Sequence, residues 1–511
     1  MRIQPPIVAV ACFLSLLLAG CTSAQAAAEG PNAQADAQPP DRPNVLLILV
    51  DDLKPAMGVY GDPYAVTPNL DALFSRGMRF DRAYCNQAVC APSRNNLMTS
   101  TRSTSSGIYD LGRHFRTAHP NAVTLTQHFM EHGYRAEGIG KVFHIGHGNV
   151  GDDASWSVPF LSESPIEYMM VDSKRGATLT REEAYFNNEM PPGGVGGLPR
   201  GAAWEVGEVE DDAYADGRIA REGVRRLRAA SERDEPFFLV LGFTKPHLPF
   251  CAPEQYWDLY DRDAFELAQV TRPPAGAPGY APKHVFIEIG NFFPCPDRAE
   301  ELPFDDELQR TLIHGYYASM SYMDAQVGLV IDELDRLGLD DDTVIVLWGD
   351  HGYHLGHHGT WTKHTNYEQD NRIPILFVAP GVTEPGSQTE AFAETVDIYP
   401  TLAELAGLPL PAGPQPIDGV SQVPVLAGEV EAVRDHAYHA YPRGRRIGRA
   451  IRTERYRLVE WKEPGASIDT AEYELYDYQE DPLETQNLAA QRPEVMEELK
   501  AILARHPEAR R

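Results

Sequence analysis

The sequence Asn44-Val45-Leu46-Leu47-Ile48-Leu49-Val50-Asp51-Asp52 joins an apolar run of strand length to two adjacent aspartates. A continuous apolar run is typical of a strand that is buried on both faces, as in a parallel sheet. Residues 237–243 and 343–348 form two further runs of this kind, and ionisable residues follow each of them. These runs predict a central sheet.

Helical patterns alternate with the predicted strands, and this alternation sets the fold class. Apolar spacing and capping residues predict helices over residues 67–74, 124–131, 211–231, 308–337 and 398–406. Residues 134–139 are a shorter strand candidate, residues 146–208 are expected as loop and insertion, and the proline-rich residues 249–303 are expected to be irregular. Strands that alternate with helices are typical of an α/β fold with a large, mostly parallel, doubly wound sheet that helices flank. Ligands of such sheets bind beyond the carboxyl ends of the strands.

Four predicted strands end in ionisable residues, which the fold would bring to one rim. These residues are Asp51 and Asp52, Lys141 and His144, Lys245 and His247, and Asp350 and His351. Three carboxylates suit a hard divalent ion, Ca²⁺ first and Mg²⁺ second, although His351 is a less usual ligand for either. The alternative is that the paired aspartates are ordinary turn or cap residues.

A second signal is Cys90-Ala91-Pro92-Ser93-Arg94, which opens a predicted helix. Unpaired backbone N–H groups at a helix N-terminus favour negative charge, and Arg94 adds a fixed cation one turn later. This arrangement suits an anion held against a nucleophile. The alternative is a buried cysteine followed by a proline that starts a helix.

This motif resembles the Cys-x-Pro-x-Arg signature of the sulfatases in the alkaline-phosphatase-like superfamily. The resemblance extends to the iduronate-2-sulfatase subgroup, which also carries Asp-His where this chain has Asp350 and His351. The segments that carry it are residues 140–144, 245–250, 359–363, 441–443 and 451–457. Two departures are Ser100, where the family usually has glycine, and Arg449, where the subgroup has tyrosine.

The resemblance implies an alkaline-phosphatase-like fold with a smaller C-terminal α+β subdomain. It also implies that a maturation enzyme converts Cys90 to formylglycine, whose hydrate is the nucleophile. The implied catalytic residues are Cys90, Arg94, Lys141, His144 and His247. Those implied for substrate binding are Lys245, Lys363 and Arg443, and those implied for Ca²⁺ or Mg²⁺ are Asp51, Asp52, Cys90, Asp350 and His351. His247 is the candidate acid and His144 the candidate base, and the two roles can be exchanged.

The implied function is hydrolysis of sulfate esters of a sulfated saccharide. A uronate-containing glycan is expected, because Arg443, Arg445, Arg446 and Arg449 form a basic cluster that could read a carboxylate. One alternative is a phosphoester or phosphonate hydrolase of the same superfamily. Another is a lipoprotein that binds sulfated glycan without turnover.

Composition limits the possible partners. The 511 residues have a formal net charge of −29, which disfavours a nucleic-acid-binding protein because such proteins need a basic face. Of the six cysteines, Cys12 lies in the predicted signal peptide, Cys21 is the predicted site of lipid attachment, and Cys90 is the candidate nucleophile. Cys85, Cys251 and Cys295 remain. This odd number predicts no full disulfide framework, and pairing among them stays open.

The N-terminal residues predict export. Residues 1–20 read as a lipoprotein signal peptide, because an apolar run precedes Leu18-Ala19-Gly20-Cys21, with Cys21 as the lipid-bearing residue. The alternative is an ordinary secretory signal cut near residues 24–28. Residues 21–42 read as a flexible tether, 43–430 as the catalytic domain, and 431–511 as a subdomain with a small sheet and a closing helix. We therefore expect a periplasmic or outer-membrane lipoprotein.

Overall fold

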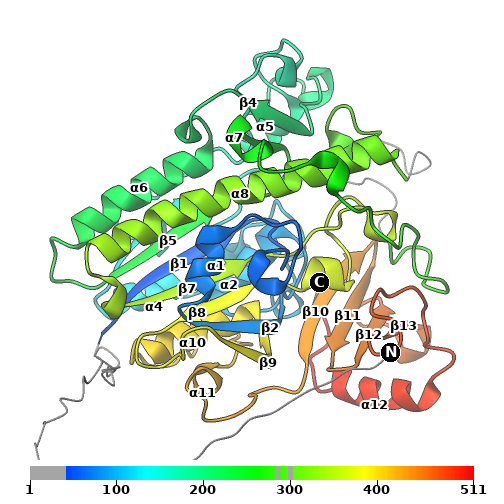
Figure 1. The fold of residues 1–511 in the computed structure, drawn as a ribbon. Helices are drawn as coiled ribbons and strands as arrows, with labels where there is room; N and C mark the ends of the chain where they lie inside the picture. Colours follow the sequence, from blue (N-terminus) through cyan, green and yellow to red (C-terminus); the bar gives the residue numbers. More distant parts are fainter. Residues whose placement is uncertain (1–41, 283–287, 297–302, 511) are drawn as a thin grey trace, which may run out of the picture. The chain divides into compact units, whose positions relative to one another are not determined.

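The central sheet has the strand order β3-β5-β1-β7-β8-β2-β9 (Figure 1). The computed structural model describes residues 42–282, 288–296 and 303–510. Strands β3, β5, β1 and β7 are parallel, β8 runs against both of its neighbours, and β2 pairs in parallel with β9. The predicted large, mostly parallel sheet is therefore confirmed. The bounds are β1 Asn44–Val50, β2 Met78–Tyr84, β3 Arg135–Gly140, β5 Phe237–Phe243, β7 Thr343–Gly349, β8 Ile375–Val378 and β9 Ser387–Glu394.

Strand β1 shows why these runs are apolar on both sides. Leu46, Ile48 and Val50 belong to one buried cluster, and the alternate residues Val45, Leu47 and Leu49 belong to another. Helices α1, α6 and α8 complete the first cluster, and α2, α4 and α10 complete the second. In Figure 1, α6 and α8 run side by side along one side of the sheet, and α10 lies on the other. The helix bounds are α1 Pro68–Phe74, α2 Cys90–Thr99, α4 Leu125–Glu131, α6 Ala215–Ala230, α8 Asp306–Arg336 and α10 Ile398–Leu405.

A second, antiparallel sheet follows the central one in the chain. It has the order β10-β11-β12-β13, and apolar residues on one of its faces pack against Met496, Leu499 and Leu503 of α12. The predicted small sheet and closing helix are thus present, while the proposed boundary near residue 430 stays a prediction. The bounds are β10 Ala437–Arg443, β11 Arg446–Arg452, β12 Tyr456–Lys462, β13 Glu472–Asp477 and α12 Pro493–Leu503.

The structure adds elements that the sequence patterns did not indicate. Strands β2 and β9 were not predicted, because polar residues interrupt both of them. Residues 146–208, expected as loop, contain α5 Arg181–Phe186 and β4 Trp204–Gly207. Strand β4 pairs with β6 Phe250–Pro253, which is followed by α7 Glu254–Trp257 in a stretch expected to be irregular.

Arg457 on β12 ties the smaller sheet to the rest of the chain. Its fully buried guanidinium lies 2.6 Å from both Glu368 and Glu484. Burial alone raises the pKa of Glu368, but Arg452 and Arg457 outweigh this effect and hold that pKa at about 2. We expect Arg457→Met to lower the free energy of unfolding by about 3–5 kcal/mol at pH 7, because it leaves buried carboxylates unpaired.

The pH dependence of this loss follows from the lowered pKa of Glu368. A carboxyl group whose folded pKa is depressed stabilises the fold above its unfolded pKa of about 4.3, and this stabilisation is lost as the pH falls toward 2. The difference in unfolding midpoint between Arg457→Met and the wild type should therefore shrink in acid. The half-exposed Arg455, paired with Asp477, supplies the control, and Arg455→Met should shift the midpoint much less. Equal midpoints for wild type and Arg457→Met at pH 7 would contradict the assignment.

The predicted signal peptide, tether and lipid-bearing Cys21 lie in the first 42 residues, nearly all outside the described part of the chain. Among the described residues, none of the helices is both long enough and apolar enough to cross a membrane. Cys85, Cys90, Cys251 and Cys295 are buried free thiols.

Candidate active site

The parallel register brings the predicted strand ends together. Val50 at the end of β1 lies opposite the last residues of both β5 and β7. The segments that carry Asp51, Lys245 and Asp350 therefore leave the sheet at one edge. Strand β3 ends beside β5 and adds Lys141.

Asp52 adopts a left-handed backbone conformation, with a φ of 59°. Its N–H donates to Oδ1 of Asp350 at 3.0 Å, and its carbonyl accepts from the hydroxyl of Tyr316 on α8 at 2.8 Å. Residues other than glycine rarely adopt this conformation unless their surroundings hold them in it, and such residues gather at functional sites. The end of β7 and helix α8 thus fix the turn that carries both aspartates.

Four buried side chains form a group that fits a metal ion. Asp51, Cys90, Asp350 and His351 bring one ligand atom each to within 4.8 Å of one another, and Asp52 belongs to an overlapping group. The Oδ1 atoms of Asp51 and Asp52 accept no hydrogen bond. Burial, with the nearby charge of Asp51, raises the pKa of Asp350 to about 8. A divalent cation would compensate these crowded carboxylates, and oxygen ligands of this kind suit Ca²⁺ or Mg²⁺.

Cys90 is the first residue of α2 and lies against this group. Its Sγ is 3.3 Å from Nε2 of His351 and 3.9 Å from Nζ of Lys141. One turn later, Nε of Arg94 donates to Oδ2 of Asp350 at 3.0 Å. The helix start therefore places the sulfur atom beside the candidate metal ligands and two cations.

Two of the three predicted lysines face the aspartates. Lys141 contacts the carboxylate of Asp51, and Nζ of Lys363 lies 3.0 Å from both carboxylate oxygens of Asp52. Burial lowers the pKa of each lysine, but the neighbouring aspartate outweighs this effect and raises it above its ordinary value. Both lysines therefore remain charged in the site.

The other two predicted substrate-binding residues are engaged elsewhere. Nζ of Lys245 donates to two carbonyls of its own loop, at 2.6 and 3.2 Å. The guanidinium of Arg443 donates to the carbonyls of Tyr280, Ala281 and His364 at 2.5–3.0 Å. The expectation that Arg443 reads a carboxylate is therefore not supported by its contacts.

The predicted basic wall is also neutralised. Arg445 lies 3.2 Å from Glu463, and Arg446 lies 3.5 Å from Glu472. Arg449 pairs with Glu460 on the neighbouring strand at 2.6 Å. The antiparallel sheet explains these pairs, because it places acidic residues of β12, β13 and their connection beside the arginines. Most of the cluster is therefore paired with carboxylates.

His144 and His247 are both buried beside the lysines. Nδ1 of His247 lies 2.5 Å from the carbonyl of Leu248, so this nitrogen carries the proton, while its Nε2 has no hydrogen-bond partner. Nε2 of His144 lies 3.2 Å from Nδ1 of His147. Burial lowers the pKa of both imidazoles, and nearby charges add to this effect: Lys141 at His144, and Lys363 and Lys141 at His247. This geometry leaves the acid and base roles open.

A cavity of about 550 Å³ opens over these groups. Cys90, His144, His247 and Lys363 all line it. The predicted residues thus divide into those at the cavity or the metal group and those, such as Lys245 and Arg443, that support neighbouring loops. Further lining residues come from the region expected to be loop, namely Arg181, Glu182, Tyr185, Phe186, Val195 and Gly196.

Sequence reasoning assigned no role to the other residues that line this cavity, among them His147, Phe186, Glu288 and His364. None of them follows a predicted strand or lies at a position assigned a role by the resemblance. Two of them stood near a recognised segment: His147 is three residues after His144, and His364 directly follows Lys363.

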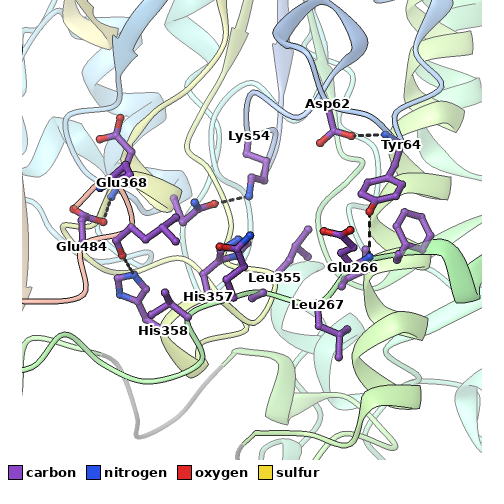
Figure 2. Close-up of a pocket in the computed structure, with 18 of the residues that line it drawn as sticks. Lys54, Asp62, Tyr64, Glu266, Leu267, Leu355, His357, His358, Glu368 and Glu484 are labelled. Carbon is purple, nitrogen blue, oxygen red and sulfur yellow. Dashed lines mark hydrogen bonds between the residues drawn. The ribbon is translucent and has the colours of Figure 1, made fainter. Parts of the chain in front are cut away.

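Figure 2 shows a second cavity, of about 290 Å³. It shares no lining residue with the first. Lys54 reaches into it and donates to Gln369 at 2.5 Å. The backbone N–H of Lys54 donates to the hydroxyl of Tyr316, which in turn bonds the carbonyl of Asp52. This cavity wall therefore supports the turn that carries the aspartates.

The comparisons decide the family. The family model described as sulfatase matches residues 43–408. The chain belongs to the sulfatase family. A second model, described as the C-terminal part of N-sulphoglucosamine sulphohydrolase, matches residues 356–509. This sulfatase is therefore a sulfuric ester hydrolase with the predicted alkaline-phosphatase-like fold.

Known proteins similar to this sulfatase include the iduronate 2-sulfatase of Mus musculus, which is 34% identical over 436 residues. That match covers 80% of this chain and 75% of the relative. A phosphonate monoester hydrolase of Agrobacterium radiobacter is similar in fold, with a TM-score of 0.71 at 23% identity, and the match covers 91% of this chain and 96% of that one. A structure solved with its substrate D-glucosamine-2-N,6-O-disulfate has a TM-score of 0.69 at 21% identity, covering 91% and 97%.

Proposed function

We propose that this sulfatase hydrolyses sulfate esters of a sulfated saccharide, with a formylglycine derived from Cys90 and one divalent ion, Ca²⁺ first and Mg²⁺ second. The observation that carries the proposal is the place of Cys90, which starts α2 beside His351 and Lys141. Its relatives support the saccharide, because one of them is named iduronate 2-sulfatase. We do not include a uronate in the proposed substrate, because the guanidinium of Arg443, which was expected to bind its carboxylate, donates to backbone carbonyls instead.

Asp51, Asp52, Asp350 and His351 would hold the ion together with residue 90. When bound, the ion supplies positive charge for the ester oxygens, and the formylglycine supplies a hydrated aldehyde as nucleophile. These carboxylates are buried and partly without hydrogen bonds, so the site is preorganised for a cation before substrate arrives.

The remaining roles belong to the chain's own side chains. Arg94, Lys141 and Lys363 surround residue 90 with fixed positive charge, which stabilises the charge that grows on the sulfate oxygens. Nε2 of His247 has no hydrogen-bond partner, and His247 lines the cavity, so this nitrogen can exchange a proton with the leaving sugar oxygen. His144 is then left to move the proton of the nucleophile, and the two roles remain exchangeable.

The proposal includes the cellular setting. We propose a signal peptide over residues 1–20, lipid on Cys21, and a tether to residue 42 that holds the catalytic domain, residues 43–430, at the periplasmic or outer-membrane surface. A maturation enzyme that makes formylglycine would be an obligatory partner.

A comparison of matched esters tests the proposal. The purified protein should hydrolyse 4-nitrophenyl sulfate with a kcat/KM at least about a hundredfold above that for 4-nitrophenyl phosphate, because Arg94, Lys141 and Lys363 are each already paired with an aspartate and little positive charge is left for the second negative charge of a phosphate ester. Release of sulfate from a panel of sulfated saccharides should then identify a preferred sugar. Faster phosphate release would favour the phosphoester alternative, and binding of glycan without any release would favour the glycan-binding alternative.

A further inference from the structure

Glu288 brings a negative charge into the catalytic cavity. Its side chain is 15% exposed, and its carboxylate oxygens lie 3.0 and 2.9 Å from Nζ of Lys363. One oxygen also accepts a hydrogen bond of 3.2 Å from Oγ1 of Thr362, and the other lies 3.6 Å from Nε2 of His247. Glu288 therefore lies beside two of the side chains that we assign to the ester, Lys363 and His247.

The position of Lys363 fixes where the substrate meets Glu288. The ammonium of Lys363 lies between Asp52 in the metal group and Glu288 in the cavity. An ester that reaches this ammonium must bring the groups beside its sulfate next to Glu288. A carboxylate has about four acceptor positions, so Glu288 can still accept hydrogen bonds from the sugar.

Among the described residues that line the cavity, each lysine and arginine already has a partner and none is left over for an acidic sugar. Among its described lining residues, the lysine and arginine side chains are those of Lys363 and Arg181. Arg181 pairs with Glu182 at 2.8 Å and donates to the carbonyl of Asn291 at 2.9 Å. A sugar carboxylate beside the ester would meet Glu288 at close range in a partly buried site, where repulsion is screened little.

Aromatic rings form another part of the lining. The ring centroid of Phe186 lies 4.8 Å from that of His147 and 5.5 Å from that of His247. Tyr185 stacks on His147 with an interplanar angle of 12°. Flat apolar faces of this kind suit the C–H face of an uncharged sugar ring.

We propose that Glu288 is a specificity-determining residue that selects a sulfated sugar with hydroxyl or ammonium groups beside the ester and rejects one with a carboxylate there. Glu288 accepts charge-assisted hydrogen bonds from these donors while the ring packs on the aromatic faces. This inference rests on the proposed function and names its substrate class as neutral or amino sugars. This substrate class would differ from that of the relative named iduronate 2-sulfatase, whose name refers to a uronate.

The test measures kcat/KM of the full-length, matured protein for three substrates: D-glucosamine 6-sulfate, D-glucose 6-sulfate and a uronate 2-sulfate monosaccharide. Each value is divided by that for 4-nitrophenyl sulfate, so that any effect of Glu288 on Lys363 cancels. The wild type should prefer the amino or neutral sugar over the uronate by at least about tenfold. Glu288→Gln should lower this preference by about tenfold to a hundredfold, because the amide loses the charge-assisted bond and the repulsion together.

Glu182→Gln is the matched control, because Glu182 lines the same cavity but is engaged by Arg181 and by the backbone N–H of Gly201. It should leave the ratio between sugars unchanged. The inference is overturned if the wild type prefers the uronate, or if Glu288→Gln keeps the wild-type ratio while only the overall rate falls. Absence of turnover on every sulfate ester, 4-nitrophenyl sulfate included, would overturn the proposed function itself and this inference with it.

Discussion

Replacing Cys90 by alanine should abolish sulfate-ester hydrolysis, with a loss of roughly four orders of magnitude or more in kcat. The reason is that residue 90 is placed as the nucleophile, at the start of α2 and beside His351 and Lys141. The fold should survive, because a cysteine is a small side chain whose loss leaves a small cavity. Steady-state assays with 4-nitrophenyl sulfate and a thermal unfolding curve check both statements.

Cys85 provides a matched control for this substitution. It is a second buried free thiol, five residues earlier in the chain, and its Sγ lies 3.7 Å from the carbonyl of Asp370 and 3.8 Å from Oδ1 of Asn371, both in α9 Glu368–Asn371. Cys85→Ala should therefore retain activity. Wild-type rates in the Cys90→Ala protein would end the assignment of the nucleophile.

Replacing Asp350 by alanine should remove the bound ion and the activity together. Asp350 belongs to the metal group and also receives Nε of Arg94 and the backbone N–H of Asp52. Asp350 is a candidate metal ligand that also orients Arg94 and the turn at Asp52, so its loss should lower kcat/KM by about 10³-fold or more. Elemental analysis of the purified variant, beside the wild type, gives the metal content directly.

Two further variants separate metal loss from misfolding. Asp350→Asn keeps the shape and an acceptor for Arg94, and should still lose most of its metal and activity. Asp324→Asn removes a buried carboxylate on α8 that instead bonds the backbone of α1 at Leu70, and should keep its metal. Full activity after exhaustive chelation, with no metal found in the wild type, would contradict the metal assignment.

The strand ends were the most predictable part of the molecule. β1, β5 and β7 are buried on both faces, so continuous apolar runs marked them, and their carboxyl ends located Asp51, His247 and Asp350. β2 and β9 escaped prediction because they carry polar residues on partly exposed positions. Without β2 the order of the strands beyond β8 could not be derived.

Side-chain partners were the least predictable part. The sequence placed Arg443 near the site, but it could not show that the carbonyls of Tyr280 and Ala281, some 160 residues earlier, would accept its hydrogen bonds. Glu288 lies in a proline-rich stretch where no strand or helix pattern fixed its position. Both contacts depend on how irregular segments fold back over the rim, which local pattern does not encode.

The most direct test of the account is the mass of the peptide that contains Cys90, taken from catalytically active protein made in a host with a formylglycine-generating enzyme. The account predicts an aldehyde at residue 90, in a fraction of molecules that rises in proportion to specific activity across preparations. A fully active preparation in which residue 90 is only an unmodified thiol would contradict it.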